Sequence, residues 1–123
     1  MPGSDVSGLK SLFYQCMPLF IALGDEKRLT IIEALTDDAR RRGDLSGENL
    51  RRHGMNVSEI TRKTSLSRPA VSHHLKILKT AGLISSRQEG TCNYYYLSIE
   101  EGTKRLMLLG NELQEILHFD TEA

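Results

Sequence analysis

The sequence predicts a mainly α-helical fold with one small β-hairpin, and three features of its central part lead to that prediction. Two short amphipathic segments, residues 57–63 and 67–79, are separated by only a few polar residues. The second segment has one apolar face and one polar, basic face. Two runs of strand-forming residues, 83–87 and 93–97, then flank a short turn sequence. This order of elements is typical of a winged helix-turn-helix domain.

Length and composition indicate one soluble globular domain. A chain of 123 residues, of which 39% are hydrophobic and 26% charged, supports one modest core. We expect a loose N-terminus over residues 1–5, a single domain over 6–118 and a C-terminal tail over 119–123.

The N-terminal part of the domain reads as two helices. Apolar residues recur at spacings of three and four over residues 6–23, which predicts a helix that Pro18 should kink or divide. Asp25 is expected to cap a second helix. In that helix Leu29, Ile32 and Leu35, with Ile31 flanking, should face inward.

Residues 37–55 are polar, contain glycine and are rich in arginine, so they read as a long connection with one short helix over residues 48–52. Two interpretations stay open for the arginines of this segment: they add contacts to phosphates, or they are simply solvated. The arginines are Arg40, Arg41, Arg42, Arg51 and Arg52.

Local signals place the helix-turn-helix at residues 57–79. Asn56 and Glu59 have the spacing of a capping box, and Ser67 is a suitable N-cap with Pro69 tolerated in the following turn. Along the second helix Val71, Leu75 and Leu78 share one face and should pack into the core. His74 is expected to pack between this helix and its neighbour.

The opposite face of that helix carries the groups a recognition helix needs. Arg68, Ser72 and His73 are candidates to reach base edges, whereas Lys76 and Lys79 suit phosphates. In the wing, residues 83–97, three further residues are placed to meet the minor groove or the DNA backbone: Arg87, Gln88 and Thr91. The candidate DNA-binding residues are Ser67, Arg68, Pro69, Ser72, His73, Lys76, Lys79, Arg87, Gln88 and Thr91.

The charge distribution supports a nucleic-acid partner although the net charge is zero. Residues 40–90 hold 11 Lys and Arg against 4 Asp and Glu, whereas the rest of the chain holds 5 against 12. A basic middle between acidic ends fits a module that presents one face to phosphates.

Three segments of the chain resemble the ArsR/SmtB family of winged-helix repressors: residues 19–35, residues 67–84 with the sequence SRPAVSHHLKILKTAGLI, and the wing ending in YYYLS. The resemblance implies a homodimer that pairs through its first and last helices, here the apolar stripes over residues 6–23 and 99–118. It also implies binding to a palindromic double-stranded operator, repression, and release by a small-molecule inducer that the sequence does not identify. Two residues depart from the family pattern: Thr61 stands in place of alanine, and Ser65 in place of glycine, where a slightly tighter or shifted turn is expected.

The metal sites of the family are expected to be absent. The stretch that carries a cysteine pair in metal-sensing relatives reads Asn-Val-Ser-Glu-Ile here, and the last helix lacks the family's Asp and His set. No cofactor is predicted. The two cysteines leave a thiol-redox-responsive repressor as an alternative: Cys16 lies on an apolar stripe and should be buried, and Cys92 lies beside the wing tip and should be exposed.

Other function classes find less support in the sequence. No glycine-rich phosphate loop, nucleophile elbow or paired carboxylates in an apolar setting is present, so no enzyme is predicted. The longest apolar run is too short to span a membrane and a secretory signal is not evident, which favours a cytoplasmic protein. A winged helix that binds only other proteins stays an alternative, and it predicts no salt-sensitive binding to DNA.

Overall fold

The computed structural model describes residues 6–43 and 45–117, so the predicted loose terminus and tail, together with His118, lie outside the described residues. Within these ranges six helices and one hairpin follow one another. In chain order they are α1 (Val6–Leu23), α2 (Glu26–Arg41), α3 (Gly47–Arg52), α4 (Val57–Thr64), α5 (Arg68–Thr80), β1 (Ile84–Glu89), β2 (Cys92–Leu97) and α6 (Glu100–Leu117). The prediction of a mainly α-helical fold with a small hairpin is confirmed.

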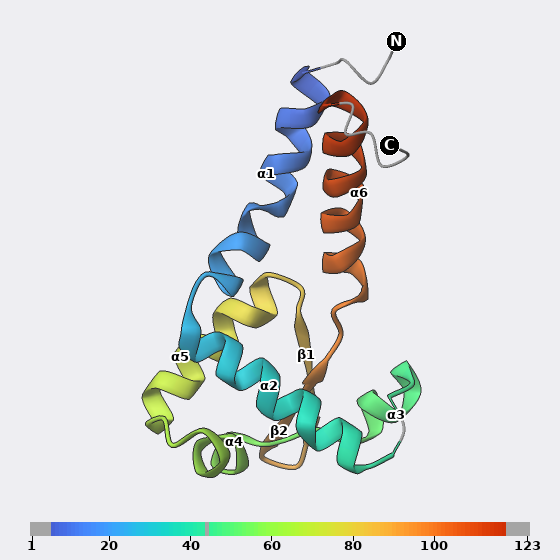
Figure 1. Ribbon diagram of the computed structural model, residues 1–123. Coiled ribbons are helices and arrows are strands. Elements are labelled where there is room, and N and C mark those ends of the chain that lie inside the picture. The colour runs from blue at the N-terminus through green and yellow to red at the C-terminus, as the bar shows by residue number, and fades with distance from the viewer. Residues whose placement is uncertain (1–5, 44, 118–123) are drawn as a thin grey trace.

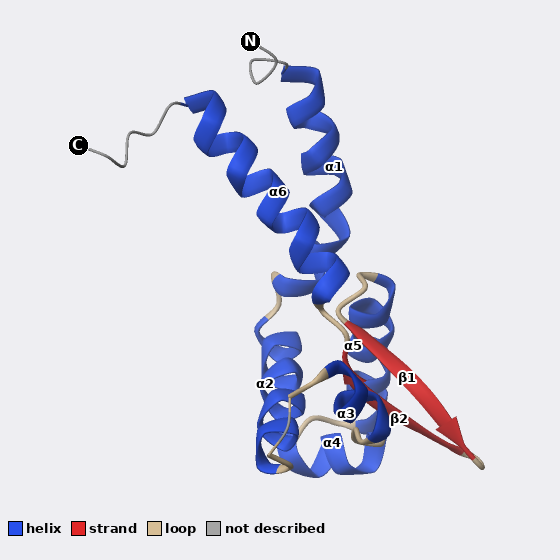
Figure 2. Cartoon of the chain, turned by 90° about the vertical axis from the view of Figure 1, so that its right-hand side faces the viewer, coloured by secondary structure: helices blue, strands red, loops and turns tan. Residues whose placement is uncertain are grey.

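The molecule consists of a body and an arm (Figure 1). Helices α1 and α6, from opposite ends of the chain, run side by side and form the arm. Helices α2, α4 and α5 and the base of the hairpin enclose the core of the body, and α3 lies beside β2. Figure 2 shows the hairpin projecting from the body as a wing. The largest fully buried side chains are Ile31, Ile60, Leu75, Leu78, Ile84, Val71 and Cys16.

The helix boundaries follow from the predicted caps. The Asp25 carboxylate accepts hydrogen bonds from the backbone N–H groups of Lys27 and Arg28 at the start of α2. Asn56 and Glu59 form the expected reciprocal capping box, with both N···O distances 2.9 Å. Ser67 Oγ accepts from the Ala70 N–H at the start of α5. Each cap satisfies amides that the first helical turn cannot pair itself.

Two predictions for the first part of the body are wrong. Helix α2 runs to Arg41, so the segment expected to be a connection from residue 37 begins as helix. Of the residues predicted to face inward on α2, Leu35 is buried and Ile32 packs against the core, but Leu29 is 47% exposed and the flanking Ile31 is fully buried. A stripe through Leu29 and a stripe through Ile31 both have helical spacing, and the buried stripe also carries Arg28. The short helix expected over residues 48–52 is present as α3.

Of the two outcomes expected at Pro18, division of the helix does not occur, because α1 continues to Leu23. The wing differs from expectation in its length. The strands are longer than predicted and pair in antiparallel register from Ile84 opposite Leu97 to Glu89 opposite Cys92. Gly90 and Thr91 alone form the turn, and Gly90 supplies the positive φ that a two-residue hairpin turn requires. Gln88, expected in the turn, therefore lies on β1.

The turn between α4 and α5 contains the one described non-glycine residue with a positive φ. Ser65 adopts the left-handed conformation at φ 61°, and its N–H donates to the Thr61 carbonyl. Serine thus takes the conformation that glycine adopts more easily, and α4 ends there.

Thr61, the second departure from the family pattern, has a buried hydroxyl without a hydrogen-bond partner among the described residues. Replacing a buried, unpaired hydroxyl by a methyl group of the same shape removes a desolvation cost. We therefore expect Thr61→Val to raise the free energy of unfolding by about 1 kcal/mol in urea denaturation.

Thr64 is the matched control, because its Oγ1 donates to the Ile60 carbonyl at 2.7 Å. Thr64→Val removes a hydrogen bond that is made and should lower the free energy of unfolding by about 1 kcal/mol. Equal shifts for the two variants would contradict the assignment of an unpaired hydroxyl.

Candidate nucleic-acid interface

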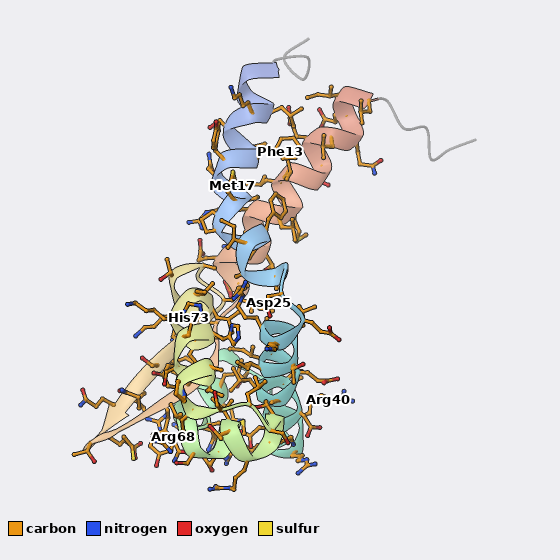
Figure 3. The ribbon with its side chains drawn as sticks, turned by 90° about the vertical axis from the view of Figure 1, so that its left-hand side faces the viewer. Phe13, Met17, Asp25, Arg40, Arg68 and His73 are labelled. Atoms are coloured by element: carbon orange, nitrogen blue, oxygen red, sulfur yellow. The ribbon has the colours of Figure 1, made fainter. Side chains whose placement is uncertain are left out.

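Helix α5 presents two chemically distinct faces. Val71, Leu75 and Leu78 are buried, as predicted, and fix the helix to the core. The predicted DNA-facing residues of the helix are exposed, and Figure 3 shows Arg68 and His73 on the outer side of α5. The exposed residues are Ser67, Arg68, Pro69, Ser72, His73, Lys76 and Lys79.

Two of the cations on this face already have partners within the chain. Arg68 Nη1 donates to Ser58 Oγ at 2.6 Å and connects α5 to α4. Lys79 Nζ donates to Ser86 Oγ at 2.8 Å and connects α5 to β1. Ser72 and Lys76 make no side-chain hydrogen bond to another residue of the described ranges. Ser72, His73 and Lys76 thus form the part of the face whose polar groups are available to a ligand.

Arg87 does not extend freely from the wing. Its Nη1 donates to the carbonyls of Arg51 at 2.6 Å and His53 at 2.9 Å, and its Nη2 lies 2.7 Å from Glu89 Oε2. The guanidinium also stacks over the Tyr94 ring, 5.1 Å from the centroid. The geometry makes Arg87 an anchor for the C-terminal end of α3. Gln88 and Thr91 are exposed on the wing.

We expect Arg87→Lys to release α3 from the wing, because an ammonium group cannot reproduce the forked contacts of a guanidinium. Amide hydrogen exchange over residues 47–53 should accelerate by about tenfold. Gln88→Lys, on the neighbouring exposed position, should leave exchange in α3 unchanged. Unaltered exchange in Arg87→Lys would show that other contacts hold α3.

The arginines of residues 40–52 are largely paired along their own helices. Arg41 lies 3.3 Å from Asp37, Arg42 lies 3.1 Å from Asp38, and Arg52 lies 3.2 Å from Glu48. These are exposed pairs one helical turn apart, which contribute a few tenths of a kcal/mol each. Figure 3 shows Arg40 on the side of the body opposite His73. Arg40 therefore does not extend the α5 face, and both interpretations of the remaining arginines stay open.

One contact of the site was only half predicted. His74 packs between helices, as expected, and is 8% exposed. Its partner, Arg28 of α2, was missed: Arg28 is also 8% exposed, and its Nη1 lies 3.1 Å from His74 Nδ1. Asp25 as a cap and the alternation of helix faces are visible in the sequence, but no sequence signal marks an arginine that points inward.

The cysteines have the environments that the sequence predicts. Cys16 is buried in α1 and Cys92 is exposed at the start of β2, and both thiols are free. Figure 1 places α1 in the arm and β2 in the wing, so the two thiols belong to separate parts of the fold. No group of three or more His, Cys, Asp or Glu side chains that could hold a metal ion occurs in the described part of the chain. No described helix has the length and apolarity to cross a membrane.

Comparison with known proteins identifies the family. A profile described as "Bacterial regulatory protein, arsR family" matches residues 49–86, from α3 to the start of the wing. The chain is 34% identical over 95 residues to the HTH-type transcriptional regulator MJ1325 of Methanocaldococcus jannaschii, covering 77% of this chain and 90% of that protein. The chain belongs to the ArsR family.

Further similarities support the fold and function of this ArsR-family protein. It is 36% identical over 69 residues to the transcriptional repressor SdpR of Bacillus subtilis, covering 55% of this chain and 72% of SdpR. Its fold matches a homodimeric winged helix-turn-helix DNA-binding domain from Mycobacterium bovis, with a TM-score of 0.58, 23% identity and coverage of 98% and 96%. The ArsR-family protein described here is therefore a DNA-binding transcriptional regulator with a winged helix-turn-helix fold.

Proposed function

We propose that the protein is a homodimeric repressor that binds a palindromic operator, with one α5 helix in each of two major grooves. The observation that carries this proposal is the division of α5 into a buried apolar face and an exposed face with Ser72, His73 and Lys76. A helix fixed to the core along one side offers a rigid polar surface of the width that a major groove admits.

The arm supports the dimer. Phe13, Met17 and Phe20 follow one another at spacings of four and three along α1, and they are 39%, 44% and 42% exposed. On α6, Leu106, Met107 and Leu117 are also exposed. Exposed large apolar side chains gathered on the two arm helices indicate a site of association. The homodimeric assembly of the M. bovis neighbour supports a second copy of this chain as the partner.

Within the proposed complex the side chains have different tasks. Ser72 and His73 read base edges, whereas Lys76 contacts a phosphate. At the start of α5 the Ser67 hydroxyl and the Arg68 backbone N–H face another phosphate, and Pro69, which has no N–H, follows in the same helical turn. Arg68 and Lys79 keep their contacts to Ser58 and Ser86 and also contact the sugar-phosphate backbone of the DNA. On the wing, Gln88 and Thr91 approach the minor groove, and Arg87 holds the wing in position.

Two substitutions on α5 separate affinity from specificity. Lys76→Ala should weaken binding to all duplexes alike and lower the slope of log K against log salt by about one unit, since one phosphate contact is lost. His73→Ala should instead reduce discrimination at one operator position by roughly 1–3 kcal/mol and leave the salt slope nearly unchanged. Fluorescence anisotropy with matched and mismatched duplexes measures both quantities. If the two effects are exchanged, the orientation of α5 in the groove is wrong.

The proposed function is tested by selection from a random duplex pool at several salt concentrations, followed by sequencing of the bound DNA. A palindromic motif with steep salt dependence supports a sequence-specific regulator. Tight binding without enrichment contradicts sequence-specific recognition. Absence of binding favours the alternative of a protein-interaction module.

Repression, the compartment and the effector are part of the proposal. The name of SdpR supports a repressor, which a reporter placed behind the selected operator tests: lower expression is expected, and higher expression indicates an activator. We place the protein in the cytoplasm and assign it no metal or cofactor. The exposed Cys92 carries the alternative of thiol-dependent release, which predicts that Cys92→Ser retains operator binding under oxidant.

A further inference from the structure

Arg28 joins three helices at the point where the arm meets the body. It lies in the first turn of α2 and is buried. Its Nε donates to the Ala22 carbonyl at 2.8 Å and its Nη2 donates to the Ile21 carbonyl at 2.9 Å. These carbonyls belong to the last turn of α1, where the helix has no amides to pair them. Arg28 therefore satisfies the end of the arm helix.

The third nitrogen of the guanidinium, Nη1, reaches the recognition helix. Arg28 Nη1 lies 3.1 Å from Nδ1 of His74 on α5. Arginine can only donate, so Nδ1 must accept and the ring proton must be on Nε2. The contact thus requires a neutral imidazole. A protonated His74 would direct an N–H at the guanidinium in a buried setting, where two facing donors are repulsive.

The surrounding charges act in both directions on His74. Burial is the largest influence and lowers the pKa of the His74 imidazole below its ordinary value, and the Asp25 carboxylate opposes this. Arg28, His73 and Lys27 act with burial. Helix α1 contributes the two backbone carbonyls that bind Arg28 rather than a charge on His74. The neutral ring that the geometry requires is therefore the form that this environment favours.

We propose that Arg28 and His74 are positioning residues for DNA binding: their contact holds the recognition helix α5 at a fixed angle to the α1 arm, and operator binding requires the contact to be intact. This inference rests on the proposed function. Because the arm carries the proposed dimer interface, the contact also sets the separation and tilt of the two recognition helices, on which half-site spacing depends. Neither residue touches DNA in this arrangement.

A pH dependence of operator binding follows from the lowered pKa of His74. The arrangement with His74 buried binds a proton less readily than an arrangement in which His74 is solvated. The buried contact is therefore fully stable above the ordinary histidine pKa and loses stability as the pH falls through about 6.5 toward the lowered value. Acid should weaken operator binding through His74. Protonation of the exposed His73 acts oppositely, because it adds positive charge beside the phosphates.

The two neighbouring histidines allow a sharp test. In a His73→Gln background, operator affinity is measured from about pH 7.5 to about pH 5.5. We expect it to fall with acid by up to roughly tenfold, because the lower pH lies about one pH unit below the ordinary histidine pKa. His74→Asn in the same background places a non-titrating oxygen acceptor near the position of Nδ1. It should bind within about threefold of its parent at the higher pH and show a flat pH profile.

Two more variants test the positioning itself. His74→Leu leaves an Arg28 donor unpaired, and Arg28→Lys leaves carbonyls at the end of α1 unpaired. Each should reduce operator affinity at the higher pH by about tenfold or more. Circular dichroism establishes that the variants are folded at the temperature of the assay. A retained pH slope in His74→Asn, or full affinity in a folded Arg28→Lys protein, would overturn the proposal.

A measurement without DNA separates this inference from the proposed function. In the free protein, nitrogen chemical shifts of the His74 ring should report a neutral imidazole protonated at Nε2 that titrates below the ordinary histidine range. If this signature is present and no duplex is bound, the proposed function is wrong and the Arg28–His74 contact is structural only. If duplexes are bound and His74 titrates as a free histidine, the proposed role of the Arg28–His74 contact is wrong.

Discussion

Met17→Glu is expected to convert the protein to a monomer and to lower its operator affinity by at least about a hundredfold. Met17 lies on the exposed apolar face of α1 together with Phe13 and Phe20, and Figure 3 shows Met17 and Phe13 on the arm. A carboxylate buried there between two copies has no partner, and an unpaired buried charge costs about 3 kcal/mol or more. Each 1.4 kcal/mol corresponds to a factor of about ten in binding. Light scattering measures the mass, and anisotropy with the selected operator measures the affinity.

Leu29→Glu is the matched control for this prediction. Leu29 is 47% exposed and Met17 is 44% exposed, and both are apolar residues on helices. Leu29 lies on α2 and belongs to neither of the two arm helices. Its substitution should leave both mass and affinity unchanged. The assignment of the interface to the arm is contradicted if Met17→Glu stays dimeric or if Leu29→Glu dissociates the dimer equally.

Gly54→Ala is expected to destabilise the fold by about 3 kcal/mol or more, since it combines backbone strain with a steric clash. Gly54 has φ 129°, and a Cβ atom there would lie 2.6 Å from the Tyr95 carbonyl oxygen. The next residue, Met55, exchanges two backbone hydrogen bonds with Tyr95, of 3.0 Å and 2.8 Å. A side chain at residue 54 therefore pushes the chain before α4 away from β2. Urea denaturation measures the loss.

Gly47→Ala provides the comparison, because a Cβ atom on Gly47 meets no atom within 4 Å and its φ is not positive. At the start of α3 alanine should be neutral or stabilise by up to about 1 kcal/mol. A Gly54→Ala protein as stable as Gly47→Ala would show that the contact between residues 54–55 and β2 is not needed for the fold.

Much of the fold is local in origin and could be predicted from the sequence. The capping box of Asn56 and Glu59 and the N-cap of Ser67 depend on residues three apart. The burial of Val71, Leu75 and Leu78 follows from the period of a helix. These signals are sufficient to define the helix-turn-helix, its exposed polar face and the wing that follows.

Which face of α2 is buried could not be predicted from the sequence alone. A stripe through Leu29 and a stripe through Ile31 both have helical spacing, and hydrophobicity alone favours neither. The tertiary structure decides, because Arg28 turns inward to bind the carbonyls that end α1 and the His74 ring of α5. With Arg28 inside, Ile31 is buried and Leu29 faces solvent.

The contacts of Arg87 are likewise decided by the tertiary structure. Its sequence position at the wing predicts a contact to DNA, and the structure adds that its guanidinium binds the Arg51 and His53 carbonyls of a segment 34 to 36 residues away. The sequence by itself determined the element order, the caps and the face of α5 that is free for DNA, because these depend on neighbours along one helix. Only the tertiary structure decided which arginines point inward and which face of α2 is buried, because those choices depend on carbonyls and rings that folding brings together from distant parts of the chain.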